Sequence, residues 1–169
     1  MEKVKDTSSE LKSEMLMVGF LVQECTFRGV PLLCMQFTTQ ALNFWSRLSA
    51  KYLERYKGIG IVFVFDSNQV DLLEKPMSTS TNNGMDVFRA VLAMPGFEKC
   101  PLCVLFNKQD LPTASSVEYL IDRFKIEELH GRNVIFRGCS ALTGQGLTES
   151  LNSLLDMMDP KSAPPASDQ

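Results

Sequence analysis

Three short apolar runs, each followed by a polar motif, constrain the fold of this chain more than any other feature. The runs span residues 59–66, 102–106 and 134–136, and they lead into Asp66, Asn107–Asp110 and Cys139–Ala141. A continuous apolar run of this length is typical of a strand that is covered on both faces. Because the carboxyl ends of parallel strands meet at one edge of a sheet, we expect the three polar motifs to converge there.

The remaining segments predict an α/β fold. Residues 20–27 and 31–37 are two β-rich runs that flank Arg28-Gly29, which predicts a hairpin. A capping box at Ser115–Glu118 indicates the start of a helix. A hairpin followed by repeated βα units predicts a mostly parallel sheet with one antiparallel hairpin and helices on both faces. Helical spacing occurs in residues 41–57, after residue 84, and in a last stripe of Leu147, Leu151, Leu154, Leu155 and Met158.

Composition limits both the domain organisation and the partners. A chain of 18.9 kDa with 44% hydrophobic residues fits one domain, which we place at residues 15–158 between flexible polar ends at 1–14 and 159–169. The net charge of −3 without a dense Lys/Arg block argues against nucleic acid as a partner. No apolar run reaches the ~18 residues of a membrane span, and Glu2 excludes myristoylation. We therefore expect no direct membrane anchor.

The five cysteines predict a reducing, cytoplasmic compartment. Cys25, Cys34, Cys103 and Cys139 lie in or beside apolar runs, where free thiols behave as small hydrophobic groups. Cys100 and Cys103 have C-x-x-C spacing, but a second pair is missing and the chain has only one histidine. We interpret them as buried thiols at the start of a strand and expect no metal site.

Asn107-Lys108-Gln109-Asp110 has the chemistry of a guanine site. The Asp110 carboxylate can accept two hydrogen bonds from the guanine N1–H and exocyclic amine, a pair that adenine does not present, while the Lys108 stem can lie over the ring. Asn107 can tie the neighbouring loops together. The Ala141 N–H could donate to the guanine carbonyl, and Ser140 could steady that loop. The alternative interpretation is a plain polar loop that ends at Pro112.

With these motifs, the chain resembles the ADP-ribosylation-factor-like small GTPases over about residues 17–158. That family binds GTP and magnesium, hydrolyses GTP slowly and changes partners through two mobile loops. The resemblance rests on Gly19-Phe20-x-Val22, the hairpin with its Phe27-Arg28-Gly29 turn, Val62–Ser67, Phe106–Pro112 and Cys139-Ser140-Ala141-x-Thr143-Gly144-x-Gly146-Leu147.

The departures from the family lie where phosphates and magnesium would bind. No G-x-x-x-x-G-K-[ST] loop occurs in the 169 residues. Aligned with the family, Met17 replaces the switch threonine, and its thioether is a poor ligand for a hard cation. Met35–Gln40 replaces Trp-Asp-x-Gly-Gly-Gln, so the magnesium-linked aspartate becomes an amide. Of this motif only Gln40 is kept, at the position that orients the attacking water in the family. We therefore expect no magnesium.

The lost phosphate loop decides the expected function. Four or more charge-assisted hydrogen bonds of roughly 1.5 to 3 kcal/mol each amount to about 6 to 12 kcal/mol of nucleotide affinity. We therefore expect a degenerate GTPase-like protein that acts as an interaction module or scaffold and requires no cofactor. Phe44 and Trp45 on the helix at 41–57 are the candidate protein-partner surface. The alternative is a guanine-nucleotide switch in membrane or ciliary traffic that still binds GTP or GDP weakly through its base loops.

A missing phosphate loop also implies a missing first strand. In the family this strand lies between the hairpin and the later strands, so its loss would expose two strand edges. Residues 11–19 or another chain could occupy that place, or the chain is a shortened product of a longer gene and is unstable alone.

Overall fold

The computed structural model describes residues 20–37, 58–71, 84–125, 129 and 132–158. The chain divides into two compact units, Met1–Arg47 and Leu48–Gln169. The predicted helix at 41–57, and with it Phe44 and Trp45, lies outside the described residues, as do Met17, Gln40 and both chain ends.

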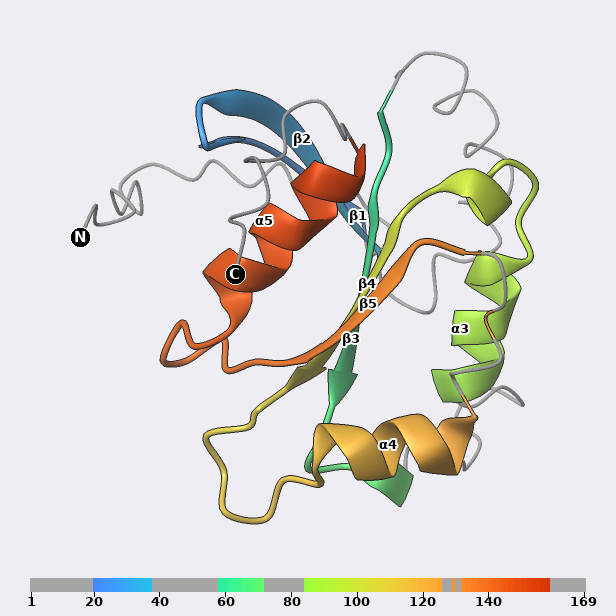
Figure 1. Cartoon of the computed structure of the whole chain (residues 1–169), viewed down its shortest axis with the longest axis vertical. Coiled ribbons are helices and arrows are strands. Elements are labelled where there is room, and N and C mark those ends of the chain that lie inside the picture. The colour runs from blue at the N-terminus through green and yellow to red at the C-terminus, as the bar shows by residue number, and fades with distance from the viewer. Residues whose placement is uncertain (1–19, 38–57, 72–83, 126–128, 130–131, 159–169) are drawn as a thin grey trace, which may run out of the picture. The chain divides into compact units, whose positions relative to one another are not determined.

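The first unit contains the predicted hairpin. Strand β1 (Phe20–Phe27) pairs antiparallel with β2 (Val30–Phe37), shown in blue in Figure 1. Both turn residues have positive φ, 53° at Arg28 and 75° at Gly29. Two positive φ values in a two-residue loop define the type I′ turn, whose twist matches that of the strands it joins. The sequence prediction of this hairpin is confirmed.

The second unit is a three-stranded parallel sheet with helices on both faces (Figure 1). The strands are β3 (Ile61–Asp66), β4 (Leu102–Asn107) and β5 (Val134–Gly138), in the order β3-β4-β5. The helices are α3 (Gly84–Leu92), the short 3₁₀ helix η2 (Phe97–Lys99), α4 (Val117–Phe124) and α5 (Leu147–Met158). The α/β prediction is confirmed, and the described strands form two sheets, the hairpin and this one.

Alternating residues of β4 supply the two layers of the core. Leu102, Val104 and Phe106 face α3 and α4 in a cluster with Phe65 and Phe88. Phe88 of α3 meets the Phe63 ring edge-on, with centroids 4.7 Å apart. On the opposite face, Cys103 and Leu105 pack with Leu154 of α5. The central strand is therefore buried on both faces.

The prediction that residues 59–66 are covered on both faces is wrong. Phe65 is buried, but Val62 and Val64 remain 41% and 55% exposed. These valines pair with Cys103 and Leu105 and so share their sheet face. Helix α5 covers that face over β4, whereas β3 stands at the end of the described strand order and keeps its valines exposed.

The capping box was predicted only partly correctly. Ser116 is the N-cap of α4, and its hydroxyl accepts a hydrogen bond from the Tyr119 N–H at 3.2 Å. With Ser116 as N-cap, the third helical position is Tyr119 rather than Glu118. The reciprocal bond of a capping box requires Glu or Gln there, so only half of the motif forms.

Candidate guanine-binding site

The three polar motifs meet at one edge of the parallel sheet, as predicted. Asp66 pairs with Asn107 at the ends of β3 and β4, and Phe106 pairs with Gly138, which directly precedes Cys139. The three strands therefore end next to one another at the same edge of the sheet. This register follows from the parallel pairing of the three apolar runs.

Backbone hydrogen bonds continue from the sheet into the loops. The Ser67 N–H donates to the Asn107 carbonyl at 3.0 Å, and the Gln109 N–H donates to the Cys139 carbonyl at 3.0 Å. The Ser115 N–H donates to the Ser67 carbonyl at 2.9 Å, which brings the chain back to β3 just before α4 begins. The loops are therefore held by main-chain contacts that do not depend on a ligand.

The Asn107 side chain links two of the motifs. Its Oδ1 accepts hydrogen bonds from the Ala141 N–H at 2.9 Å and from the Cys139 thiol at 3.7 Å. The link between loops that the sequence led us to expect is therefore present. It also engages the Ala141 N–H, the group expected to donate to the guanine carbonyl. A base bound there would have to share or replace this hydrogen bond.

Lys108 is held by a residue that the sequence analysis did not count among the site residues. Its Nζ lies 2.6 Å from Asp66 Oδ2, and Asp66 Oδ1 accepts the Asn68 N–H at 3.0 Å. Lys108 has a φ of 72°, in the left-handed region that non-glycine residues rarely adopt. The sequence feature that pointed to Asp66 was its position as the acidic residue at the end of the first apolar run.

Asp110 presents an exposed carboxylate. Within the part of the chain that the structure describes, this carboxylate forms no hydrogen bond or ion pair. The side chain that would distinguish guanine from adenine is therefore solvated and available. Of the five predicted guanine-site residues, it is the one with the least structural restraint.

Ser140 stabilises the loop that follows β5 through hydrogen bonds to other residues of the same loop. It is fully buried, and its Oγ accepts the Thr143 N–H at 3.1 Å. Its backbone N–H donates to Gln145 and its carbonyl accepts from Gly144. Gly146, at a φ of 74°, passes so close to the Gly138 carbonyl that an added Cβ would overlap it. This glycine is required both by its φ and by that close approach.

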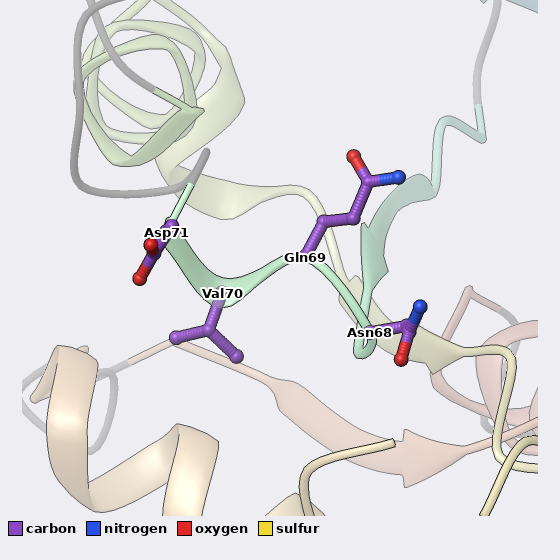
Figure 2. Close-up of a pocket in the computed structure, with 4 residues that line it drawn as sticks. All are labelled: Asn68, Gln69, Val70 and Asp71. Atoms are coloured by element: carbon purple, nitrogen blue, oxygen red, sulfur yellow. The ribbon is translucent and has the colours of Figure 1, made fainter. Parts of the chain in front are cut away.

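A shallow hollow lies beside the site, lined by four consecutive residues from Asn68 to Asp71 (Figure 2). Their side chains point in different directions in Figure 2 and do not meet at one point. Asn68 Oδ1 already accepts the Thr113 hydroxyl at 2.6 Å. This hydrogen bond joins two loops, and the hollow, lined by a single segment, does not gather polar groups around one point.

The thiols divide into two classes. Cys100, Cys103 and Cys139 are buried, as interpreted from the sequence, and burial raises the pKa of Cys103 to about 11. The Cys100 thiol contacts the Gly96 carbonyl at 3.5 Å. The expectation that Cys25 and Cys34 behave as buried hydrophobic groups is wrong, because both are exposed on the hairpin.

The described residues offer neither a metal site nor a helix that could span a membrane. They contain no group of three or more His, Cys, Asp or Glu side chains placed to hold a metal ion. None of their helices has the length and apolar character needed to cross a membrane.

Comparison with known proteins assigns the fold and the loops to a family. The family model of the ADP-ribosylation factor family matches residues 6–158. The chain is 35% identical over 72 residues to ADP-ribosylation factor-like protein 14 of Mus musculus, an alignment that covers 42% of this chain and 38% of that relative. The chain thus aligns with less than half of this relative's length. Since the family model spans most of the chain, the chain belongs to the ADP-ribosylation factor family of small GTPases.

Proposed function

We propose that this protein is a degenerate member of its family that acts as a protein-interaction module or scaffold, with little or no GTP hydrolysis. The observation that carries the proposal is the combination of an ordered set of base loops with the absence of a G-x-x-x-x-G-K-[ST] segment from the 169 residues. Base selectivity without phosphate contacts gives weak nucleotide binding, because the phosphate loop supplies most of the charge-assisted hydrogen bonds.

The geometry of the base loops supports the same proposal. The Ala141 N–H already donates to Asn107 Oδ1, and the Lys108 ammonium group is paired with Asp66. A base that uses the Ala141 N–H must replace an existing hydrogen bond, so the new hydrogen bond adds roughly 1 kcal/mol or less. Hydrogen bonds within the protein hold the loops together, which suits a domain whose fold serves to present a surface.

A protein partner follows from this proposal, and Phe44 and Trp45 remain the candidate contact residues from the sequence. We place the protein in the cytoplasm, where the thiols of Cys100, Cys103 and Cys139 stay reduced. Its family suggests an assembly in membrane traffic or at the cilium, an argument by analogy.

Calorimetric titration with guanosine, GMP, GDP and GTP in the presence of magnesium tests the proposal. Without phosphate contacts, affinity should stay micromolar or weaker and should rise less than about tenfold from guanosine to GTP, since tenfold corresponds to about 1.4 kcal/mol. Asp110→Ala should remove any preference for guanosine over adenosine. Asp122→Ala, which removes an exposed carboxylate on α4, is the matched control and should leave it unchanged.

A second candidate function is a guanine-nucleotide switch in which a partner or another segment supplies the phosphate contacts. The observation that favours it is the exposed Asp110 carboxylate at the converged strand ends. Saturable submicromolar GTP binding by this chain, or a gain of several hundredfold from guanosine to GDP, would replace the scaffold proposal with this one.

A further inference from the structure

Two exposed cysteines lie side by side on one face of the β1–β2 hairpin. In the register of the hairpin, Cys25 pairs with Leu32 and Cys34 pairs with Gln23. The two cysteines are therefore diagonal neighbours on the same face. Their sulfur atoms are 3.3 Å apart, close enough for a thiol hydrogen bond in either direction.

The position of this pair is fixed by the turn. The two residues are only nine positions apart, and the type I′ turn at Arg28-Gly29 sets the register between the strands. A one-residue slip would move one cysteine to the other face of the hairpin. The contact between the thiols thus depends on the same register that forms the hairpin.

Accessibility separates these two thiols from the other three. Cys25 and Cys34 are exposed, whereas Cys100, Cys103 and Cys139 are buried. A small disulfide in solution can reach the first pair but is excluded from the buried thiols, since thiol–disulfide exchange requires access to the attacking sulfur. Thiol–disulfide exchange on the folded protein is therefore directed to the hairpin.

We propose that Cys25 and Cys34 form a reversible dithiol–disulfide site whose oxidant is a low-molecular-weight disulfide such as glutathione disulfide. A disulfide bond requires a sulfur–sulfur distance of about 2.0 Å, so the two atoms must approach by roughly 1.3 Å. Diagonal neighbours on paired strands usually have Cα atoms about 7 to 8 Å apart, more than most disulfides span, so the two strands must also draw together at this point. The bond would join β1 to β2 covalently and lock their register.

The reaction consists of two exchange steps. One of the two thiols, for example Cys25, loses its proton and attacks one sulfur of glutathione disulfide; a Cys25–glutathione bond forms, the glutathione S–S bond breaks, and one glutathione leaves and takes up a proton. The other thiol then loses its proton and attacks the Cys25 sulfur; the Cys25–Cys34 bond forms, the Cys25–glutathione bond breaks, and the second glutathione leaves and takes up a proton. In total, two cysteines lose two electrons and two protons, and one glutathione disulfide becomes two glutathione thiols.

The environment of Cys34 keeps its thiol protonated. Desolvation by the hairpin, together with its hydrogen bond to Cys25, raises the pKa of Cys34 to about 11. Little thiolate therefore forms on Cys34 near neutral pH. The Cys34 proton must leave before this sulfur attacks, whichever of the two cysteines reacts first.

To test this proposal, the full chain is equilibrated in glutathione buffers of increasing disulfide content and then quenched with acid. The protein is denatured, its free thiols are alkylated, and the alkylated positions are mapped by mass spectrometry. The wild-type protein should lose two alkylatable thiols together and yield a peptide bridged between Cys25 and Cys34. Cys34→Ser should instead accumulate a mixed disulfide with glutathione at Cys25, and Cys25→Ser should accumulate one at Cys34. Thr26→Ser, on the other face of the hairpin, is the matched control and should form the bridge like the wild type.

Three results would overturn the proposal. The wild type could accumulate glutathione on both hairpin cysteines without a bridge, the bridge could involve one of the buried cysteines, or it could join two molecules. Protein-concentration dependence on a non-reducing gel identifies the last case. Urea provides a further criterion, because unfolding removes the register and should lower the ratio of bridged protein to mixed disulfide.

Discussion

At the scale of single residues, the site depends on a few side chains and glycines whose roles are set by close contacts. Asp66 determines where the Lys108 ammonium group lies, at 2.6 Å, and Asn107 engages the Ala141 N–H. Lys108 is 45% exposed, so its ion pair orients the side chain more than it stabilises the fold. The clearest steric requirement belongs to Gly146.

Gly146→Ala should destabilise the protein by roughly 2 to 4 kcal/mol, because the added methyl group meets both an unfavourable φ and the Gly138 carbonyl. Gly144→Ala is the matched control. It has a similar φ of 82° but open space around its Cβ, so it should lose only about 1 kcal/mol. Urea denaturation measures both values. Equal losses would show that the contact with Gly138 can relax.

At the scale of secondary-structure elements, the position of a strand in the sheet decides how much its side chains stabilise the fold. Val104 on the central strand β4 is fully buried, whereas Val64 on β3 is 55% exposed. Both residues belong to continuous apolar runs of the sequence. Their difference arises because β4 has a strand on each side and helices on both faces.

Val104→Ala should cost roughly 2 to 3 kcal/mol of unfolding free energy, from lost apolar burial and the cavity left behind. Val64→Ala removes the same atoms from a largely exposed position and should cost about 0.5 kcal/mol or less. The comparison requires only denaturant midpoints of the two variants. A large loss at Val64 would mean that residues outside the described ranges cover it.

At the scale of the whole molecule, the buried thiols link stability to pH. Burial raises the pKa of Cys100, Cys103 and Cys139, with Cys103 reaching about 11 from an ordinary value of 9.0. Below pH 9 these thiols are protonated in both the folded and unfolded states, and their full contribution to stability is present. As the pH rises from 9 to 11, the unfolded chain releases protons that the folded chain retains, so stability must fall.

Cys103→Ala should therefore make the decline in stability between pH 9 and pH 11 shallower than in the wild type, whatever its effect at neutral pH. Urea midpoints measured across this range under reducing conditions provide the test. Ionisation of other groups contributes equally to both proteins and cancels in the comparison. Parallel curves would indicate that the Cys103 thiol is more solvated than its burial implies.

Much of the fold was predictable because it follows from local patterns. The apolar runs located β3, β4 and β5 to within two residues of their observed bounds, and Arg28-Gly29 located the hairpin turn. The convergence of Asp66, Asn107 and Cys139 followed from parallel pairing. The half-formed capping box shows the limit of such reasoning, since a shift of one residue in the N-cap moved Glu118 away from the position that completes the motif.

The sequence alone determined the order of strands and helices, the motifs at the strand ends and the absence of a phosphate-loop motif from these 169 residues, because each is encoded in neighbouring residues. Only the tertiary structure decided which groups are already engaged: Lys108 by Asp66, the Ala141 N–H by Asn107, and Cys34 by Cys25. Such partners are brought together by strand register and loop closure rather than by adjacency in the sequence. A periodic pattern reports which face a residue occupies, but not what it meets there.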